Sequence, residues 1–88
     1  MLKLSSEEKG YVLKQIATIC DLNKIDYEVL EGFDNFIEEL IIKHNDKRYY
    51  ITDVVILGTS LLIKVGEGCD YALFGIKEFM FGLLCIGE

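Results

Sequence analysis

The most constraining feature of this chain is a change in the spacing of its apolar residues near residue 25. Before that point the apolar residues recur every three or four positions, at Val12, Leu13, Ile16, Ala17, Ile19 and Cys20. From Ile25 onward they alternate with polar residues. The first spacing is typical of an amphipathic helix, and the second is typical of a strand with one exposed face. A chain with this order is expected to fold as an α+β protein.

Capping residues mark both ends of the first helix. Ser5 and Glu8 have the spacing of a capping box, in which each side chain accepts a hydrogen bond from the backbone N–H of the other residue. Asn23 tolerates the left-handed backbone conformation that often ends a helix. The sequence therefore predicts a helix from about Ser6 to Leu22.

Three strands are predicted to follow this helix. The first runs from Ile25 to Leu30 and is closed by Glu31 and Gly32. The second is expected from Phe36 to His44 and the third from Arg48 to Leu57, where β-branched and aromatic residues are frequent. A turn from Asn45 to Lys47 joins them, because Asn and Asp favour turns.

The remainder of the chain is predicted with one alternative open. Residues 59–66 fit either a fourth strand or a short helix, because the spacing of their apolar residues does not separate the two. Asp70 is expected to cap a final helix with an apolar face formed by Leu73, Phe74, Ile76, Phe79, Met80, Leu83 and Leu84. The expected fold is one domain over residues 1–88, a two-layer α+β sandwich with an N-terminal helix, a three- to four-stranded antiparallel sheet and a C-terminal helix.

The acidic residues are concentrated in one segment. Between Asp21 and Glu39 there are seven acidic side chains and a single base, Lys24. The rest of the chain carries eight acids and eight bases and is neutral. A local excess of one sign creates a directed field, so this segment favours a basic partner and disfavours direct binding to nucleic acid.

The acidic segment is expected to form a ridge along one edge of the sheet. Asp26 and Glu28 are two residues apart on one strand, so both side chains point to the same face. Glu38 and Glu39 are adjacent and fall on opposite faces unless the strand is bulged. The acids also fit a solvated face that keeps an apolar protein soluble. The candidate contacts with a basic partner are Asp26, Glu28, Glu31, Asp34, Glu38 and Asp46.

The sequence carries no pattern typical of catalysis, of a metal site or of a cofactor. His44 is the only histidine, and the cysteines lie far apart, at Cys20, Cys69 and Cys85. We interpret the cysteines as buried thiols in a reducing compartment. The segment from Gly66 to Tyr71 begins like a dinucleotide-binding motif, but Tyr71 replaces the third glycine, which predicts an ordinary strand-to-helix loop. We expect a non-enzymatic cytoplasmic protein with no signal peptide and no membrane span.

Several residues support a resemblance to a known family. They are Asp26-Tyr27, Val29, Leu40-Ile41-Ile42-Lys43, Asn45-Asp46 and Tyr50-Ile51. From about Asn23 to Asp53 the chain resembles the small acidic anti-CRISPR proteins of phages, which inhibit the RNA-guided nuclease of type II CRISPR systems. The resemblance implies a DNA mimic whose carboxylates block the arginine pair that reads the short motif beside the DNA target, in the host bacterial cytoplasm. It would direct Asp26, Glu28, Glu31, Asp34 and Asp46 toward that basic channel.

Two other functions remain open from the sequence. The apolar C-terminal segment is a candidate contact of a homodimer or larger homo-oligomer through Phe74, Phe79, Met80, Phe81 and Leu84. A small-ligand-binding counter-defence protein with a pocket at a subunit interface would have Tyr49, Tyr50 and His44 as candidate contacts.

Overall fold

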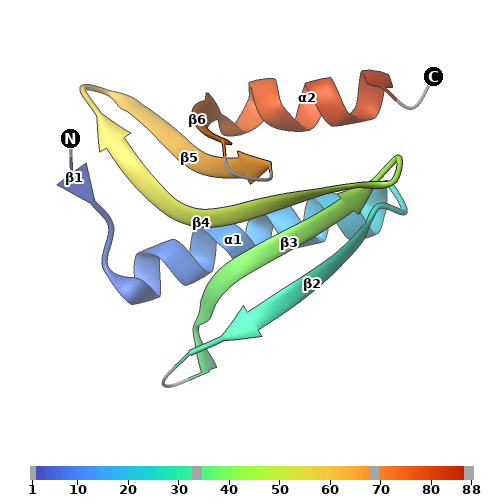
Figure 1. The fold of residues 1–88 in the computed structure, drawn as a ribbon. Coiled ribbons are helices and arrows are strands. Elements are labelled where there is room, and N and C mark those ends of the chain that lie inside the picture. Colours follow the sequence, from blue (N-terminus) through green and yellow to red (C-terminus); the bar gives the residue numbers. More distant parts are fainter. Residues whose placement is uncertain (1, 33–34, 68–69, 87–88) are drawn as a thin grey trace.

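The computed structural model describes residues 2–32, 35–67 and 70–86 (Figure 1). Its elements are β1 (Leu2–Lys3), α1 (Ser6–Leu22), β2 (Asp26–Glu31), β3 (Ile37–His44), β4 (Lys47–Leu57), β5 (Ser60–Glu67), β6 (Asp70–Gly75) and α2 (Ile76–Ile86). Within these residues the strands form one six-stranded antiparallel sheet. The order is β2-β3-β4-β5-β6, and β1 pairs with the second half of β4.

The first helix confirms the prediction from the sequence. It spans Ser6–Leu22, and the Ser5 and Glu8 side chains form the expected capping box. Its C-terminus differs in one detail. Asn23 caps the helix with a φ of −106°, and the left-handed conformation falls instead on Lys24, with a φ of 57°.

The C-terminal third decides one open alternative and corrects one prediction. The segment that was open between strand and helix is strand β5, and Asp70 begins strand β6 rather than capping a helix. Leu73 and Phe74 therefore belong to the sheet, and α2 begins only at Ile76. The sheet is larger than the three to four strands predicted, because β1 and β6 join it. The physical reason for the error at β6 is that its whole length pairs with β5, from Asp70 opposite Glu67 to Gly75 opposite Leu62, which local spacing does not reveal.

Both helices cover one face of the sheet. The fully buried strand residues Leu40, Ile42, Ile51 and Ile63 belong to one apolar cluster with residues of α1 and α2. The helices contribute to this cluster chiefly through Leu13, Ile16, Cys20, Phe79, Met80 and Leu83. In Figure 1, α1 passes behind β3 and β4. The molecule is therefore a two-layer α+β sandwich, and the other face of the sheet carries no helix among the described residues.

A β-bulge bends the central strand β4. Ile51 pairs with Val65 and Asp53 pairs with Lys64, so Thr52 is an extra residue in β4. Figure 1 shows the resulting curvature of β4. The first half of β4 pairs with β3, and the second half pairs with β1.

In the described residues no helix is long and apolar enough to cross a membrane.

The β3–β4 turn provides a test of this backbone geometry. His44 pairs with Lys47, and the two residues between them, Asn45 and Asp46, have φ values of 51° and 65°. This is the geometry of a type I′ hairpin turn, which favours glycine at its second position. We expect Asp46→Gly to raise the free energy of unfolding by about 1 kcal/mol, measured by urea denaturation.

The control for this prediction is Asp46→Ala. That variant removes the same carboxylate but keeps a side chain in the left-handed conformation, so no gain is expected. Equal stabilisation by both variants would show that the charge of Asp46, rather than its backbone conformation, limits the stability of the turn.

Candidate functional site

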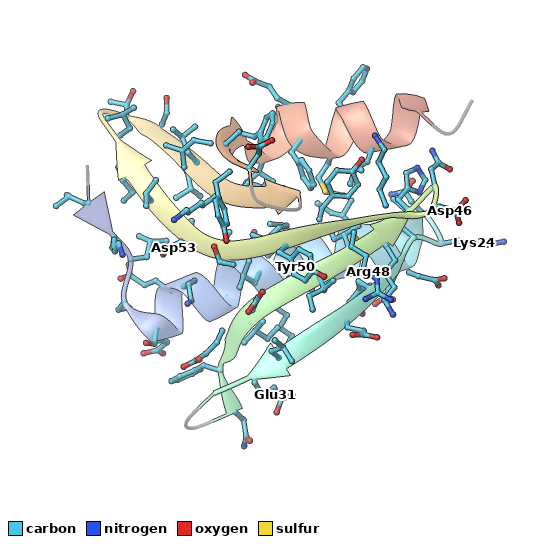
Figure 2. All side chains as sticks on the ribbon, viewed as in Figure 1. Lys24, Glu31, Asp46, Arg48, Tyr50 and Asp53 are labelled. Carbon is cyan, nitrogen blue, oxygen red and sulfur yellow. The ribbon has the colours of Figure 1, made fainter. Side chains whose placement is uncertain are left out.

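The face of the sheet opposite the helices, here called the outer face, is built from alternate residues of the strands. Cross-strand pairing aligns Asp26 with Lys43 and Arg48 in one row. The next row joins Glu28, Ile41, Tyr50, Gly66 and Tyr71. The positions of Arg48 and Tyr50 on the sheet can be followed in Figure 2. The outer face is thus a mixed surface of acids, bases and aromatic rings.

Bases from neighbouring strands offset the first acids of the acidic segment. The Lys43 ammonium forms an ion pair with the Glu28 carboxylate and is aligned with Asp26 in the register. The hydrogen bond from Lys43 lowers the pKa of Glu28, the positive charge of Lys43 adds to this effect, and Arg48 contributes less. The charge separation seen in the linear sequence is therefore partly cancelled at this end of β2.

Two further acids of the sequence analysis are placed differently. The Asp21 carboxylate accepts a hydrogen bond of 2.8 Å from the Tyr27 hydroxyl, and this bond raises the pKa of Tyr27. Asp46 lies in the β3–β4 turn, where a polar hollow is also lined by Lys43, Lys47 and Arg48. Neither Asp21 nor Asp46 extends an acidic ridge.

Three acids at the other end of the β2–β3 hairpin are not paired with a base in the way that Glu28 is paired with Lys43. Glu31, Glu38 and Glu39, here called the acidic end, form no ion pair with any residue that the structure describes. Glu31 is labelled in Figure 2 at the end of β2 far from the β3–β4 turn. Asp34, predicted to belong to the same surface, lies outside the described residues.

A second β-bulge shapes the acidic end. Leu30 pairs with Glu39 and Glu31 pairs with Ile37, so Glu38 is an extra residue in β3. The bulge interrupts the alternation of faces that would otherwise separate Glu38 from Glu39. The Glu38 carboxylate lies against Gly32, where a Cβ atom would come within 2.2 Å of its Oε1 atom. The glycine thus leaves room for the Glu38 side chain beside the hairpin.

Some residues of the predicted oligomer contact are buried in the structure, and others are exposed. Phe79 and Met80 are buried in the core of the single chain, so they are not available to a partner. Phe81 is 70% exposed on α2, and Phe74 is 38% exposed on β6. The side chain of Leu84 lies outside the described part of the chain.

The two edges of the sheet differ in charge. The β2 edge carries Asp26, Glu28 and Glu31, whereas β6 carries no charged residue after Asp70. Among the described residues no strand pairs with the outer edge of β6. Its exposed apolar side chains are Tyr71, Leu73 and Phe74. The sequence pattern predicts a helix for these residues and so does not reveal this edge, although a run of aromatic and apolar residues without charge is also typical of a strand.

The predicted contacts of a small ligand do not come together. Tyr49 and Tyr50 are adjacent in β4 and point to opposite faces, Tyr49 toward the helices and Tyr50 to the outer face. His44 lies at the end of β3, and its Nε2 atom is buried without a hydrogen-bond partner among the described residues. Tyr49 lines a pocket beside β6 and α2, Tyr50 lines a different hollow on the outer face, and His44 lines the polar hollow at the β3–β4 turn.

The described side chains include no evident centre for metal or nucleophilic chemistry. No group of three or more His, Cys, Asp or Glu residues in the described part of the chain could hold a metal ion. Cys20 is buried in the core, and burial, with a smaller effect of the Asp21 charge, raises the pKa of its thiol to about 11. The thiol therefore stays protonated at neutral pH and is a poor nucleophile. Gly66 and Tyr71, the first and last residues of the glycine motif, do not precede a helix as predicted but pair with each other across β5 and β6.

Comparison of this chain with protein-family models, with curated proteins and with solved structures found no match. The features of the described residues considered below are the acidic end, the outer face and the β6 edge.

The ion pair between Lys43 and Glu28 makes a testable prediction about pH. The pKa of Glu28 should lie below the usual glutamate range in the native protein and rise toward it in Lys43→Met. Because the folded-state pKa is lower than that of the unfolded chain, the stabilisation is complete above the unfolded pKa and is lost as pH falls through the folded pKa. The stability difference between the two proteins should therefore be present at neutral pH and vanish in acid.

The measurement is an NMR titration of the Glu28 carboxyl, with urea unfolding at each pH. Lys14→Met, on the exposed side of α1, is the control and should leave the titration of Glu28 unchanged. An identical pKa of Glu28 in native protein and Lys43→Met would contradict the ion pair.

Proposed function

We propose that this protein is a non-enzymatic binding protein whose acidic end occupies a basic, nucleic-acid-binding site of another protein. The observation that carries the proposal is the grouping of Glu31, Glu38 and Glu39 at one end of the β2–β3 hairpin without an ion pair to any described residue. Carboxylates in this condition are free to accept charge-assisted hydrogen bonds from arginine, which are about twice as strong as neutral ones.

The proposed contact is narrower than the row of acids expected from the sequence. Glu28 already accepts a hydrogen bond from Lys43, and Asp26 is aligned with the same base. An arginine of a partner would have to displace Lys43 before it could bind Glu28. The acids at the hairpin end need no such exchange, and they extend the contact toward the sequence position of Asp34.

The class of partner follows from the chemistry of the surface. Sites that bind nucleic acid use clustered arginine and lysine to contact phosphates and base edges. Carboxylates presented on a hairpin compete for the same donors, which makes the protein a DNA mimic. The resemblance of the segment from Asn23 to Asp53 to phage anti-CRISPR proteins favours the RNA-guided nuclease of a type II CRISPR system as the target, in the cytoplasm of the phage host.

The test measures how much target DNA a guide-loaded type II nuclease binds with and without this protein. Native protein should reduce the amount of target DNA bound. The variant Glu31→Gln/Glu38→Gln/Glu39→Gln should inhibit at least about tenfold more weakly, because each lost charge-assisted hydrogen bond is worth about 1.5–3 kcal/mol. The matched control Asp26→Asn/Glu28→Gln should retain inhibition to within about threefold, because those acids are already offset by Lys43.

Salt concentration gives an independent reading of the same experiment. Inhibition should weaken between low and moderate salt, because exposed charges are screened over about 10 Å at 0.1 M. Inhibition that is unchanged by salt and by the triple substitution, or a native protein that leaves DNA binding intact, would show that the acidic end does not act as a DNA mimic.

The β6 edge favours a second candidate function, a homo-oligomeric interaction module. An unpaired edge strand that carries no charge after its first residue is a template for a further strand. In an antiparallel pair centred on β6, Asp70 of one copy lies opposite Gly75 of the other copy, close to the position of Lys77. The two Asp70 side chains lie at opposite ends of this pair, so a second copy of the chain is complementary in both shape and charge.

Light scattering tests this candidate. Native protein should have the mass of a dimer, and Leu73→Lys, which introduces a charge on the exposed edge, should have that of a monomer. Leu30→Lys on the opposite edge strand, β2, is the control and should remain dimeric. A strictly monomeric native protein would remove this candidate.

A further inference from the structure

A pocket of about 300 Å³ opens between β6 and α2. It is separate from the acidic end, which is formed by β2 and β3 at the other edge of the sheet. Its walls include the aromatic residues Tyr49, Phe74 and Phe79, and two acids, Asp70 and Glu78, also line it. This combination of aromatic rings and carboxylates restricts the chemistry of a ligand.

The aromatic rings form one continuous wall. The centroids of Tyr49 and Phe79 are 5.7 Å apart, with an angle of 76° between the ring planes. Those of Phe74 and Phe79 are 5.9 Å apart, with an angle of 43°. Because the faces of such rings are electron-rich, they attract a cation within about 6 Å of a ring centroid. They also provide the apolar surface that the alkyl groups of an organic cation require.

Two carboxylates give the pocket a negative charge. Asp70 begins β6 and Glu78 lies in the first turn of α2, and both side chains are exposed. Neither forms an ion pair with a base among the described residues. They would repel an anion, and two carboxylates beside apolar walls offer too few oxygen ligands for a hard metal ion such as Ca²⁺. A small organic cation satisfies the carboxylates and the rings together.

We infer that the pocket between β6 and α2 binds a small organic cation with an alkylated ammonium group. The alkylated head packs against Tyr49, Phe74 and Phe79, and its charge is balanced by Asp70 and Glu78. This inference is independent of the proposed function, because the acidic end contributes no residue to the pocket.

Gly82 provides a way to fill the pocket. It lines the pocket from α2, and a Cβ atom at this position would have no heavy atom within 4 Å. A glycine inside a helix is also less favourable than a residue with a side chain. The Cβ atom of Gly82→Leu therefore meets no clash, and the variant is expected to keep the fold while its side chain occupies the binding volume.

The inference is tested by isothermal titration with choline and with its neutral analogue of the same shape, 3,3-dimethyl-1-butanol. Choline should bind the native protein at least about tenfold more tightly than the alcohol. Asp70→Asn/Glu78→Gln should weaken choline binding at least about tenfold and leave binding of the alcohol unchanged. Asp26→Asn/Glu28→Gln removes the same number of charges from the distant edge and should bind choline as the native protein does.

Three results would overturn the inference. They are absence of choline binding to the native protein, equal affinity for choline and the alcohol, and native choline affinity in Asp70→Asn/Glu78→Gln.

Gly82→Leu locates the site, since it should lose choline binding while its circular dichroism spectrum and unfolding temperature show an intact fold. Retention of choline binding by folded Gly82→Leu would likewise exclude this pocket. Inhibition of the nuclease by Asp70→Asn/Glu78→Gln is measured in parallel, so failure of the cation site is distinguished from failure of the acidic end.

Discussion

Burial of Leu40, Ile42 and Ile51 beneath the helices is the constraint on which the rest of this structure depends. Side chains in a strand alternate between faces, so a shift of one residue in register would move these side chains to the exposed side of the sheet. The register that keeps them buried also aligns Lys43 with Asp26. The distribution of charge on the outer face is therefore a consequence of how the core is packed.

The sequence predicted those parts of the fold whose signals are local. The capping box at Ser5 and the alternation through β2, β3 and β4 gave element boundaries within about one residue of those observed. The error came at Asp70–Gly75, where Leu73 and Phe74 have a spacing that continues into the apolar face of α2. What makes this segment a strand is its pairing with β5, and a partner strand is not visible in a local pattern.

The candidate site was predicted less completely because it depends on contacts between strands. A count along the chain shows the acids between Asp21 and Glu39, but only the sheet register shows that Lys43 offsets Glu28. The sequence also indicated that Glu38 and Glu39 would separate unless β3 was bulged, and the bulge is present. In α2 the spacing correctly indicated an apolar face, yet it could not distinguish the buried Phe79 from the exposed Phe81.

The acids of the β2–β3 hairpin have a structural role as well as a proposed functional one. Charged side chains on an edge strand discourage pairing with other chains, and β2 carries three of them whereas β6 carries only Asp70, at its first position. Protection of an edge requires only acids on the edge strand itself. Glu38 and Glu39 lie on β3 before its pairing with β4 begins at Leu40, so these two acids also protect an edge on the β4 side of β3. Their position beside Glu31, without a compensating base among the described residues, is what favours a basic partner at this end of the sheet.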